Sequence, residues 1–227
     1  MNIKRIFLNE KTAPVLLPIF LKLDNILYKL ISRTSVLANN NKHPKHNIIK
    51  YEQWFIDKLD VNEIVLEVGS HSGEMSKQLA TKADKVIAVE IEQNLYARAI
   101  IENSHEKILY ICGDATKIDM SSFEISTLAL SNVLEHIKER DLFLKKLINS
   151  IKWKNTPRFL IRVPMATRDW VTILKKQMNI NYFLDPTHYT EYSEKELKEE
   201  IERSGLKIKS WDIKFGESFI ECTTNEG

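Results

Sequence analysis

The sequence predicts a doubly wound α/β domain built on a seven-stranded, mostly parallel sheet. Five short apolar runs, each the length of a buried strand, alternate along the chain with stretches of helical character. The chain then ends in two alternating runs separated by Gly216 and Glu217, a pattern typical of an antiparallel hairpin. Alternating strands and helices favour a parallel sheet with helices on both faces, and the hairpin should join that sheet at or near one edge.

The individual elements follow from these patterns. Strands are expected at residues 64–68, 86–90, 107–111, 128–130, 159–163, 207–215 and 218–224, and helices at 73–83, 93–103 and 140–151. A last helix should begin at Ser193, because Ser193 and Glu196 have the spacing of a capping box, and should end at Gly205. Residues 165–192 show no period and are expected to form a long segment without a predicted helix or strand.

The composition is that of a globular protein with one main domain. The chain has 227 residues, and its 33 basic and 31 acidic side chains nearly balance, which does not favour a nucleic-acid-binding surface. The two cysteines, Cys112 and Cys222, lie in apolar strand-like runs, so we expect free thiols and a cytoplasmic protein. No cysteine and histidine cluster has zinc-ligand spacing, so the sequence predicts no metal site.

Residues 1–46 are expected to form a helical segment and linker before the domain at 47–227. Residues 15–31 are strongly apolar but contain Pro18, Lys22, Asp24 and Lys29, so they predict neither a membrane span nor a signal peptide. We expect an amphipathic helix that packs on the domain or on a second subunit of a homodimer. Peripheral docking on a membrane surface is the alternative.

Acidic side chains end or follow three successive predicted strands. The first strand carries Glu67 and runs into a turn with Gly69, Ser70 and Gly73, where glycine allows close approach of backbone to a ligand. Glu90 ends the second strand, where a carboxylate can accept hydrogen bonds from ribose hydroxyls. Asp114 follows the third strand. Ligands of such sheets bind at the carboxyl ends of the strands, so these acids predict a nucleoside cofactor site.

These motifs together resemble class I S-adenosylmethionine-dependent methyltransferases, which have a Rossmann-like fold. The resemblance covers the glycine-rich turn, Glu90, the run Gly113-Asp114-Ala115, and residues 131–137, which are similar to the small-molecule and glycan branch. It implies S-adenosylmethionine as cofactor and S-adenosylhomocysteine as product. The implied cofactor contacts are Glu67 for the methionine amine, Gly69, Ser70 and Gly73 for the methionine portion, Glu90 for the ribose, Asp114 and Ala115 for the adenine, and Ser131 below the sulfonium.

Two positions depart from related patterns. His71 stands where the family has its middle glycine, so it is either a tolerated turn residue or a substrate-facing one. Residues 85–97 also look like RNA adenine dimethyltransferases, but those enzymes need an Asn-Pro-Pro-Tyr or Asn-Leu-Pro-Tyr motif after the fourth strand. Here Asn132 is followed by Val133 and Leu134, which argues against methylation of a nucleic-acid amine.

Two histidines are candidates for a catalytic general base. His136 follows the fourth strand, and His188 lies in a segment with Asp185 and Tyr189 that is similar to the Asp-x-x-His segment covering the active site of glycan and small-molecule methyltransferases. Packing on the next helix is the competing interpretation for His136, and a polar loop position for His188. Tyr51 is a further substrate candidate, unless it only packs on the sheet. Arg168, Asp169 and Trp170 could line a sugar site or lie on the surface.

The sequence therefore predicts methyl transfer to a sugar, glycolipid or small metabolite. Residues 43–55 also look like the N-terminal signature of methyltransferases found with surface-polysaccharide enzymes. One alternative is an RNA or protein methyltransferase, for which the even charge gives no support. Another alternative is a cofactor-binding partner subunit without catalysis. The sequence does not choose between a hydroxyl and an amine as the acceptor.

Overall fold

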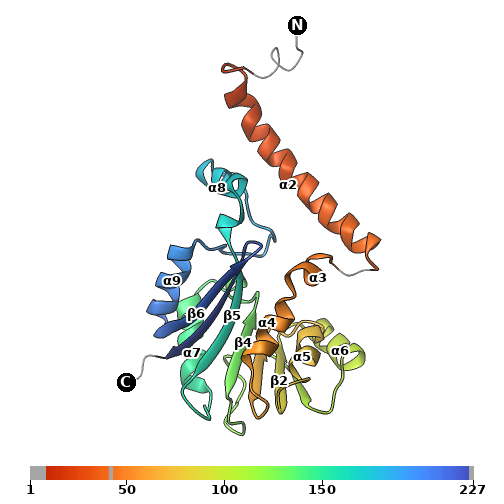
Figure 1. The fold of residues 1–227 in the computed structure, drawn as a ribbon, viewed down its shortest axis with the longest axis vertical. Helices are drawn as coiled ribbons and strands as arrows, with labels where there is room; N and C mark the ends of the chain where they lie inside the picture. The colour runs from red at the N-terminus through yellow and green to blue at the C-terminus, as the bar shows by residue number, and fades with distance from the viewer. Residues whose placement is uncertain (1–8, 41–42, 225–227) are drawn as a thin grey trace.

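The computed structural model describes residues 9–40 and 43–224 and confirms the α/β fold (Figure 1). Seven strands form one sheet in the order β3-β2-β1-β4-β5-β7-β6. The first five strands are parallel, and β7 pairs antiparallel with both β5 and β6. The strands are β1 (Ile64–Val68), β2 (Lys85–Glu90), β3 (Ile108–Cys112), β4 (Thr127–Ser131), β5 (Arg158–Pro164), β6 (Leu206–Lys214) and β7 (Glu217–Thr224).

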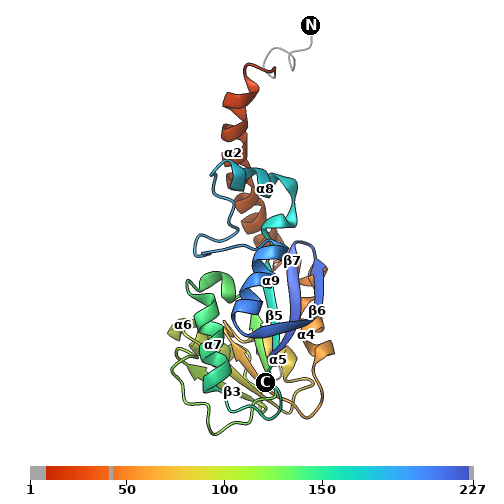
Figure 2. The same cartoon turned by 90° about the vertical axis from the view of Figure 1, so that its left-hand side faces the viewer.

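Helices cover both faces of this sheet (Figure 2). Alternate residues of each buried strand point to opposite faces, which is why one set of apolar side chains can serve each layer. On one face, Leu66 and Leu128 pack with Leu144 of α7 (Arg140–Ser150) and Leu197 of α9 (Glu194–Arg203). The other face holds the side chains of α4 (Tyr51–Lys58) and α5 (Glu74–Leu79), with Phe55 among them. The remaining helices of the domain are α3 (Lys45–Ile49), α6 (Gln93–Glu102), α8 (Trp170–Gln177) and the short 3-10 turns η1 (Leu134–His136) and η2 (Ala166–Arg168).

The boundaries of the predicted elements follow the sequence pattern closely, but the predicted helices did not include α3, α4 or α8. The capping box at Ser193 is formed: its hydroxyl accepts from the Glu196 amide, and the Glu196 carboxylate accepts from the Ser193 amide. In the segment expected to lack structure, α8 begins after Asp169, whose side chain accepts from the Thr172 amide at 2.6 Å. Cys112 and Cys222 are free thiols.

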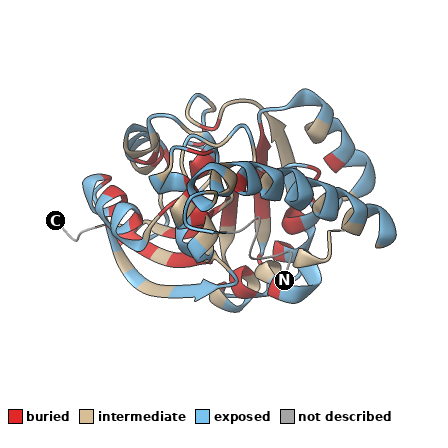
Figure 3. Ribbon diagram, turned by 90° about the horizontal axis from the view of Figure 1, so that it is seen from above, coloured by how far each residue is buried: buried red, intermediate tan, exposed pale blue. Residues whose placement is uncertain are grey.

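The N-terminal helix α2 (Ala13–Ala38) projects away from the sheet (Figure 1). It packs little on its own domain: Leu21 is its one buried residue, and its domain contacts include the ion pair of Asp24 with Lys175 and the hydrogen bond from Asn25 to the Asn181 carbonyl. Figure 3 shows that most of this helix is exposed. No helix among residues 9–40 and 43–224 is long and apolar enough to cross a membrane. Part of the linker expected at 39–46 lies outside the described residues.

Candidate functional site

The turn after β1 holds two glycines that pack closely against neighbouring side chains. Gly69 and Gly73 both have left-handed backbone angles, with φ of 76° and 84°. A Cβ atom on Gly69 would collide with the side chain of Val133, and one on Gly73 would collide with the ring of Tyr110. These two positions therefore require glycine for both conformation and space.

His71 keeps the left-handed backbone of this turn, with φ of 50°, although it has a side chain. Its ring is exposed and its Nδ1 lies 2.9 Å from the Ser72 hydroxyl, while its backbone amide donates to Glu90 Oε2 at 2.7 Å. The residue thus serves the site through its amide, and its ring lies at the surface.

Glu67 and Glu90 are both buried at the carboxyl ends of their strands. Burial raises the pKa of the Glu67 carboxyl to about 8, with nearby Glu74 and Glu90 adding to the effect, and the Ser76 hydroxyl donates to it. An ammonium group beside Glu67 would supply the opposite charge that this buried carboxyl lacks. Glu90 accepts backbone hydrogen bonds from His71 and, at 2.8 Å, from Glu92, which fixes its carboxylate at the strand end.

Asp114, the third acid of the site, is bound by residues that are its close neighbours in the sequence. Asp114 accepts from the amide and hydroxyl of Thr116 and forms an ion pair with Lys117 at 3.0 Å. Slight burial opposes ionisation, but the hydrogen bonds from Thr116 and Lys117 dominate and hold the pKa of Asp114 below its usual value. Beside it Ala115 is buried, and Ser131 ends β4 partly exposed. The carboxyl ends of β1, β2 and β3 thus present the three acids in neighbouring positions.

The structure brings His136 and His188 together from separate segments. Their rings pack edge to face with centroids 4.7 Å apart. His136 belongs to η1, directly after β4, and His188 is carried by the loop that the Tyr189 amide ties to the Glu135 carbonyl at 2.8 Å. Burial and the neighbouring His188 lower the pKa of His136. The Tyr189 ring itself is exposed.

Side chains of the same loop orient both imidazoles. The Thr187 hydroxyl lies 2.8 Å from Nδ1 of His136 and donates to Asp185 at 2.5 Å. Nδ1 of His188 lies 3.0 Å from Glu191, which is completely buried. With the Glu135 carboxylate, the two histidines form a set of possible cation ligands that the sequence spacing did not reveal.

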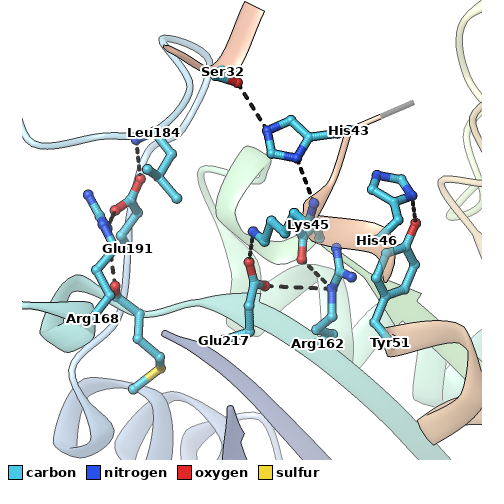
Figure 4. Close-up of polar contacts among 12 residues, drawn as sticks. Ser32, His43, Lys45, His46, Tyr51, Arg162, Arg168, Leu184, Glu191 and Glu217 are labelled. Carbon is cyan, nitrogen blue, oxygen red and sulfur yellow. Dashed lines mark hydrogen bonds and ion pairs between the residues drawn. The ribbon is translucent and has the colours of Figure 1, made fainter. Parts of the chain in front are cut away.

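A charged cluster around Arg162 and Glu217 was also missed by the sequence pattern (Figure 4). Arg162, on β5, is nearly buried, donates to the Asn132 side chain at 2.8 Å and lies 3.6 Å from Glu217. Its guanidinium lies 3.9 Å from the centre of the Tyr51 ring, and Lys45 pairs with Glu217. One signal was available, because an arginine interrupts the apolar run of a buried strand.

Two of the three residues suggested for a sugar site have structural roles. Arg168 pairs with Glu191 and donates to the Met165 and Tyr182 carbonyls. Asp169 caps α8, and Trp170 is 72% exposed. Arg168 and Asp169 also line a cavity with Tyr28 of α2 and Tyr182, so a sugar site at these residues stays a prediction.

Part of the chain matches a known protein family. The profile described as "Methyltransferase domain" matches residues 66–152, which hold the glycine turn, Glu90, Asp114 and both residues Glu135 and His136. Residues 66–152 thus form a methyltransferase domain, and they hold the motifs from which the sequence predicted a class I S-adenosylmethionine-dependent enzyme. Within this methyltransferase domain, the matched motifs and the buried acids agree on S-adenosylmethionine as the cofactor.

Solved structures share the fold of this methyltransferase at low identity. An S-adenosylmethionine-dependent methyltransferase from Clostridium acetobutylicum is 12% identical with a TM-score of 0.62, covering 88% of this chain and 100% of that one. Magnesium protoporphyrin IX methyltransferase from Synechocystis, with S-adenosylhomocysteine bound, is 15% identical with a TM-score of 0.59, covering 79% of this chain and 83% of that one.

A curated relative is similar over a shorter stretch. Ribosomal RNA small subunit methyltransferase A of Mycoplasma capricolum is 26% identical over 120 residues, which cover 50% of this chain and 44% of the relative. The methyltransferase thus spans about half the length of the curated relatives it matches.

Proposed function

We propose that this methyltransferase transfers the S-adenosylmethionine methyl group to a hydroxyl-bearing acceptor, a sugar, glycolipid or small metabolite. The observation that carries the proposal is the pairing of His136 with His188 at the carboxyl end of β4, beside Ser131. Methyl transfer requires the acceptor to lie in line with the sulfonium methyl group, and groups that hold or activate it must therefore stand at this edge of the sheet.

The acids at the strand ends determine the cofactor contacts that we propose. Glu67 would hold the methionine ammonium, and Gly69, Ser70 and Gly73 would line the methionine portion. Glu90 would hold the ribose, with Asp114 and Ala115 at the adenine and Ser131 below the sulfonium. The raised pKa of Glu67 supports the first assignment, because a bound ammonium would stabilise the charge that burial opposes.

The charged cluster supports a polar acceptor. Arg162 Nη1 is buried and has no hydrogen-bond partner among the described residues, and Glu217 Oε2, likewise without a hydrogen bond there, has only the ion pair with Arg162 Nε at 3.6 Å. Buried polar atoms in native proteins are almost always paired, so a ligand with hydroxyl groups would complete this cluster. Tyr51, stacked on Arg162 and hydrogen-bonded to His46 at 3.0 Å, would form the adjoining wall. Asp185 and Tyr189 would contribute from the loop.

An RNA acceptor is the second candidate, because the curated relatives are ribosomal RNA methyltransferases. Against it, residues 131–134 contain neither the proline nor the aromatic ring that adenine dimethyltransferases need after the fourth strand, where the ring stacks on a flipped base. Incubation with radiolabelled S-adenosylmethionine and fractionated cell extract distinguishes the candidates. We expect label in the glycan, lipid or small-molecule fraction. Label in RNA alone would contradict the proposal, and cofactor binding without any label would indicate a non-catalytic subunit.

We further propose that α2 places this methyltransferase on an anionic membrane surface. At 100° per residue, the exposed side chains of Ile19, Leu23, Ile26 and Leu30 lie opposite Leu21, the residue that faces the domain. Lys22, Lys29 and Arg33 border this apolar arc, and the one acid of the helix, Asp24, pairs with Lys175 of its own domain.

The charges favour a lipid surface over a second copy of the chain. Two copies packed through this arc would bring the same basic border together without an acid to neutralise it. An anionic lipid surface instead complements a basic amphipathic helix. An enzyme held on a lipid surface by α2 would lie close to a glycolipid acceptor in the same membrane.

A further inference from the structure

We infer that Glu135, His136 and His188 form a binding site for one divalent transition-metal cation, of the class of Zn²⁺ or Mn²⁺. One ring nitrogen from each histidine and one carboxylate oxygen from Glu135 lie within 4.8 Å of one another. Two imidazoles and one carboxylate are a donor set that binds divalent first-row metals. Ligands of a tetrahedral ion stand roughly 3.4 Å apart, so small rotations of the exposed His136 ring would close the set.

The Glu135 side chain is the second, independent observation. It is completely buried, and neither carboxylate oxygen has a hydrogen-bond partner among the described residues. An isolated carboxylate of this kind is costly unless a positive charge completes its surroundings. A cation bound by Glu135 and the two histidines would supply that positive charge. Among the described residues, no other group is in hydrogen-bond contact with the Glu135 carboxylate.

Both histidines are oriented in the way that metal-binding imidazoles usually are. Nδ1 of His188 is engaged by the Glu191 carboxylate, and Nδ1 of His136 by the Thr187 hydroxyl, which itself donates a hydrogen bond to Asp185. Partners at Nδ1 fix the ring orientation and the tautomer, and they leave Nε2 as the donor atom. Glu191 is itself held by Arg168 and by the Leu184 amide.

The cation site itself does not depend on the proposed function. Only its role in methyl transfer rests on that function. Three protein ligands leave coordination positions open, and the acceptor oxygen could occupy one of them. A coordinated hydroxyl would release its proton to solvent, its oxygen would bond to the methyl carbon, and the electron pair of the broken C–S bond would stay on sulfur. The histidines would then act as ligands, and not as the general base that the sequence suggested.

Calorimetric titration of chelator-treated protein with ZnCl₂ and with MnCl₂, without any acceptor, tests the site. We expect one cation per chain for at least one of the two metals. Glu135→Gln and His136→Ala should each weaken binding at least tenfold, while His105→Ala, at an exposed histidine outside the cluster, should leave it unchanged. A thermal shift on adding S-adenosylmethionine shows that each variant is folded. His136→Ala, at an exposed position, keeps the test decisive if Glu135→Gln does not fold.

The outcomes separate this inference from the proposed function. Absence of saturable binding by millimolar metal, or equal affinity of wild type and Glu135→Gln, would overturn the cation site. Methyl transfer that persists after complete metal removal would overturn its catalytic role. Tight binding sensitive to Glu135→Gln, but with no methyl transfer to any fraction, would retain the cation site and reject the proposed function.

Discussion

At the scale of single residues, the cofactor side of the site depends on carboxylates held in unusual surroundings. Glu67 is buried and carries a pKa of about 8, whereas Glu90 is fixed by two backbone amides. The two acids therefore differ in what they can do. Glu67 lacks a positively charged partner, whereas the Glu90 carboxylate is held rigidly at the end of β2.

Glu67 should make the stability of the cofactor-free protein fall as pH rises. Its pKa is about 8 in the folded chain against an ordinary 4.5, so the folded state binds more protons between these values. The contribution of the protonated Glu67 carboxyl to the free energy of unfolding is therefore complete below about pH 4.5 and is lost as pH rises through about 8. Urea unfolding at pH 5.5 and 8.5 should show that the free energy of unfolding changes less between these two pH values in Glu67→Gln than in wild type. Glu106→Gln, at an exposed position, should match wild type, and equal slopes in all three proteins would refute the assignment.

Glu90→Ala should weaken S-adenosylmethionine binding by about 1–3 kcal/mol, because it removes a charged hydrogen-bond acceptor from the ribose. Calorimetry would measure the dissociation constant. Glu92→Ala, an exposed acid two residues away, is the matched control and should bind normally. Unchanged affinity in Glu90→Ala would reject the ribose assignment.

At the scale of elements, caps and turns determine where the site residues stand. The capping box of α9 begins two residues after Glu191, and the Asp169 cap starts α8 beside Arg168, which pairs with Glu191. These local hydrogen bonds therefore flank the loop that carries His188.

Ser193→Ala should lower the free energy of unfolding by about 1 kcal/mol, because it removes the side-chain acceptor for the Glu196 amide. Chemical denaturation would measure the change. Ser104→Ala, at an exposed serine outside any helix, should change it much less. Equal stability of the two variants would show that this cap contributes little.

Local pattern predicted the elements, because strand and helix periods are read from neighbouring residues. The parallel strands, the terminal hairpin and the helix after Ser193 were all found this way. The helix after Asp169 was missed, because a single aspartate cap in a mixed sequence is a weak signal. The contact of His136 with His188 was equally hidden, since it joins residues far apart in sequence.

At the scale of the whole molecule, the helix α2 stands apart from the compact domain and is mostly exposed (Figure 3). Its exposed side chains form an apolar arc with a basic border. The sequence predicted its amphipathic character but not its projection. Packing of this helix depends on long-range contacts with Lys175 of α8 and with Asn181 in the segment after α8, which no local pattern contains.

The membrane proposal predicts co-sedimentation of the chain with vesicles that contain anionic phosphatidylglycerol, and much less with neutral phosphatidylcholine vesicles. The double variant Lys22→Glu and Lys29→Glu should lose most of the binding, because it reverses the charge of the border. Lys195→Glu, on exposed α9, is the control. Equal binding of the double variant and wild type would reject a lipid surface, and concentration-dependent dimerisation through α2 would favour a second copy.

The central claim is that methyl transfer occurs beside the His136 and His188 pair. Its most direct test compares wild type with His188→Ala, using labelled S-adenosylmethionine and fractionated extract, with cofactor affinity measured in parallel. We expect label in the glycan, lipid or small-molecule fraction, a loss of at least tenfold in His188→Ala, and unchanged cofactor affinity. Undiminished transfer by His188→Ala, or label confined to RNA, would contradict it.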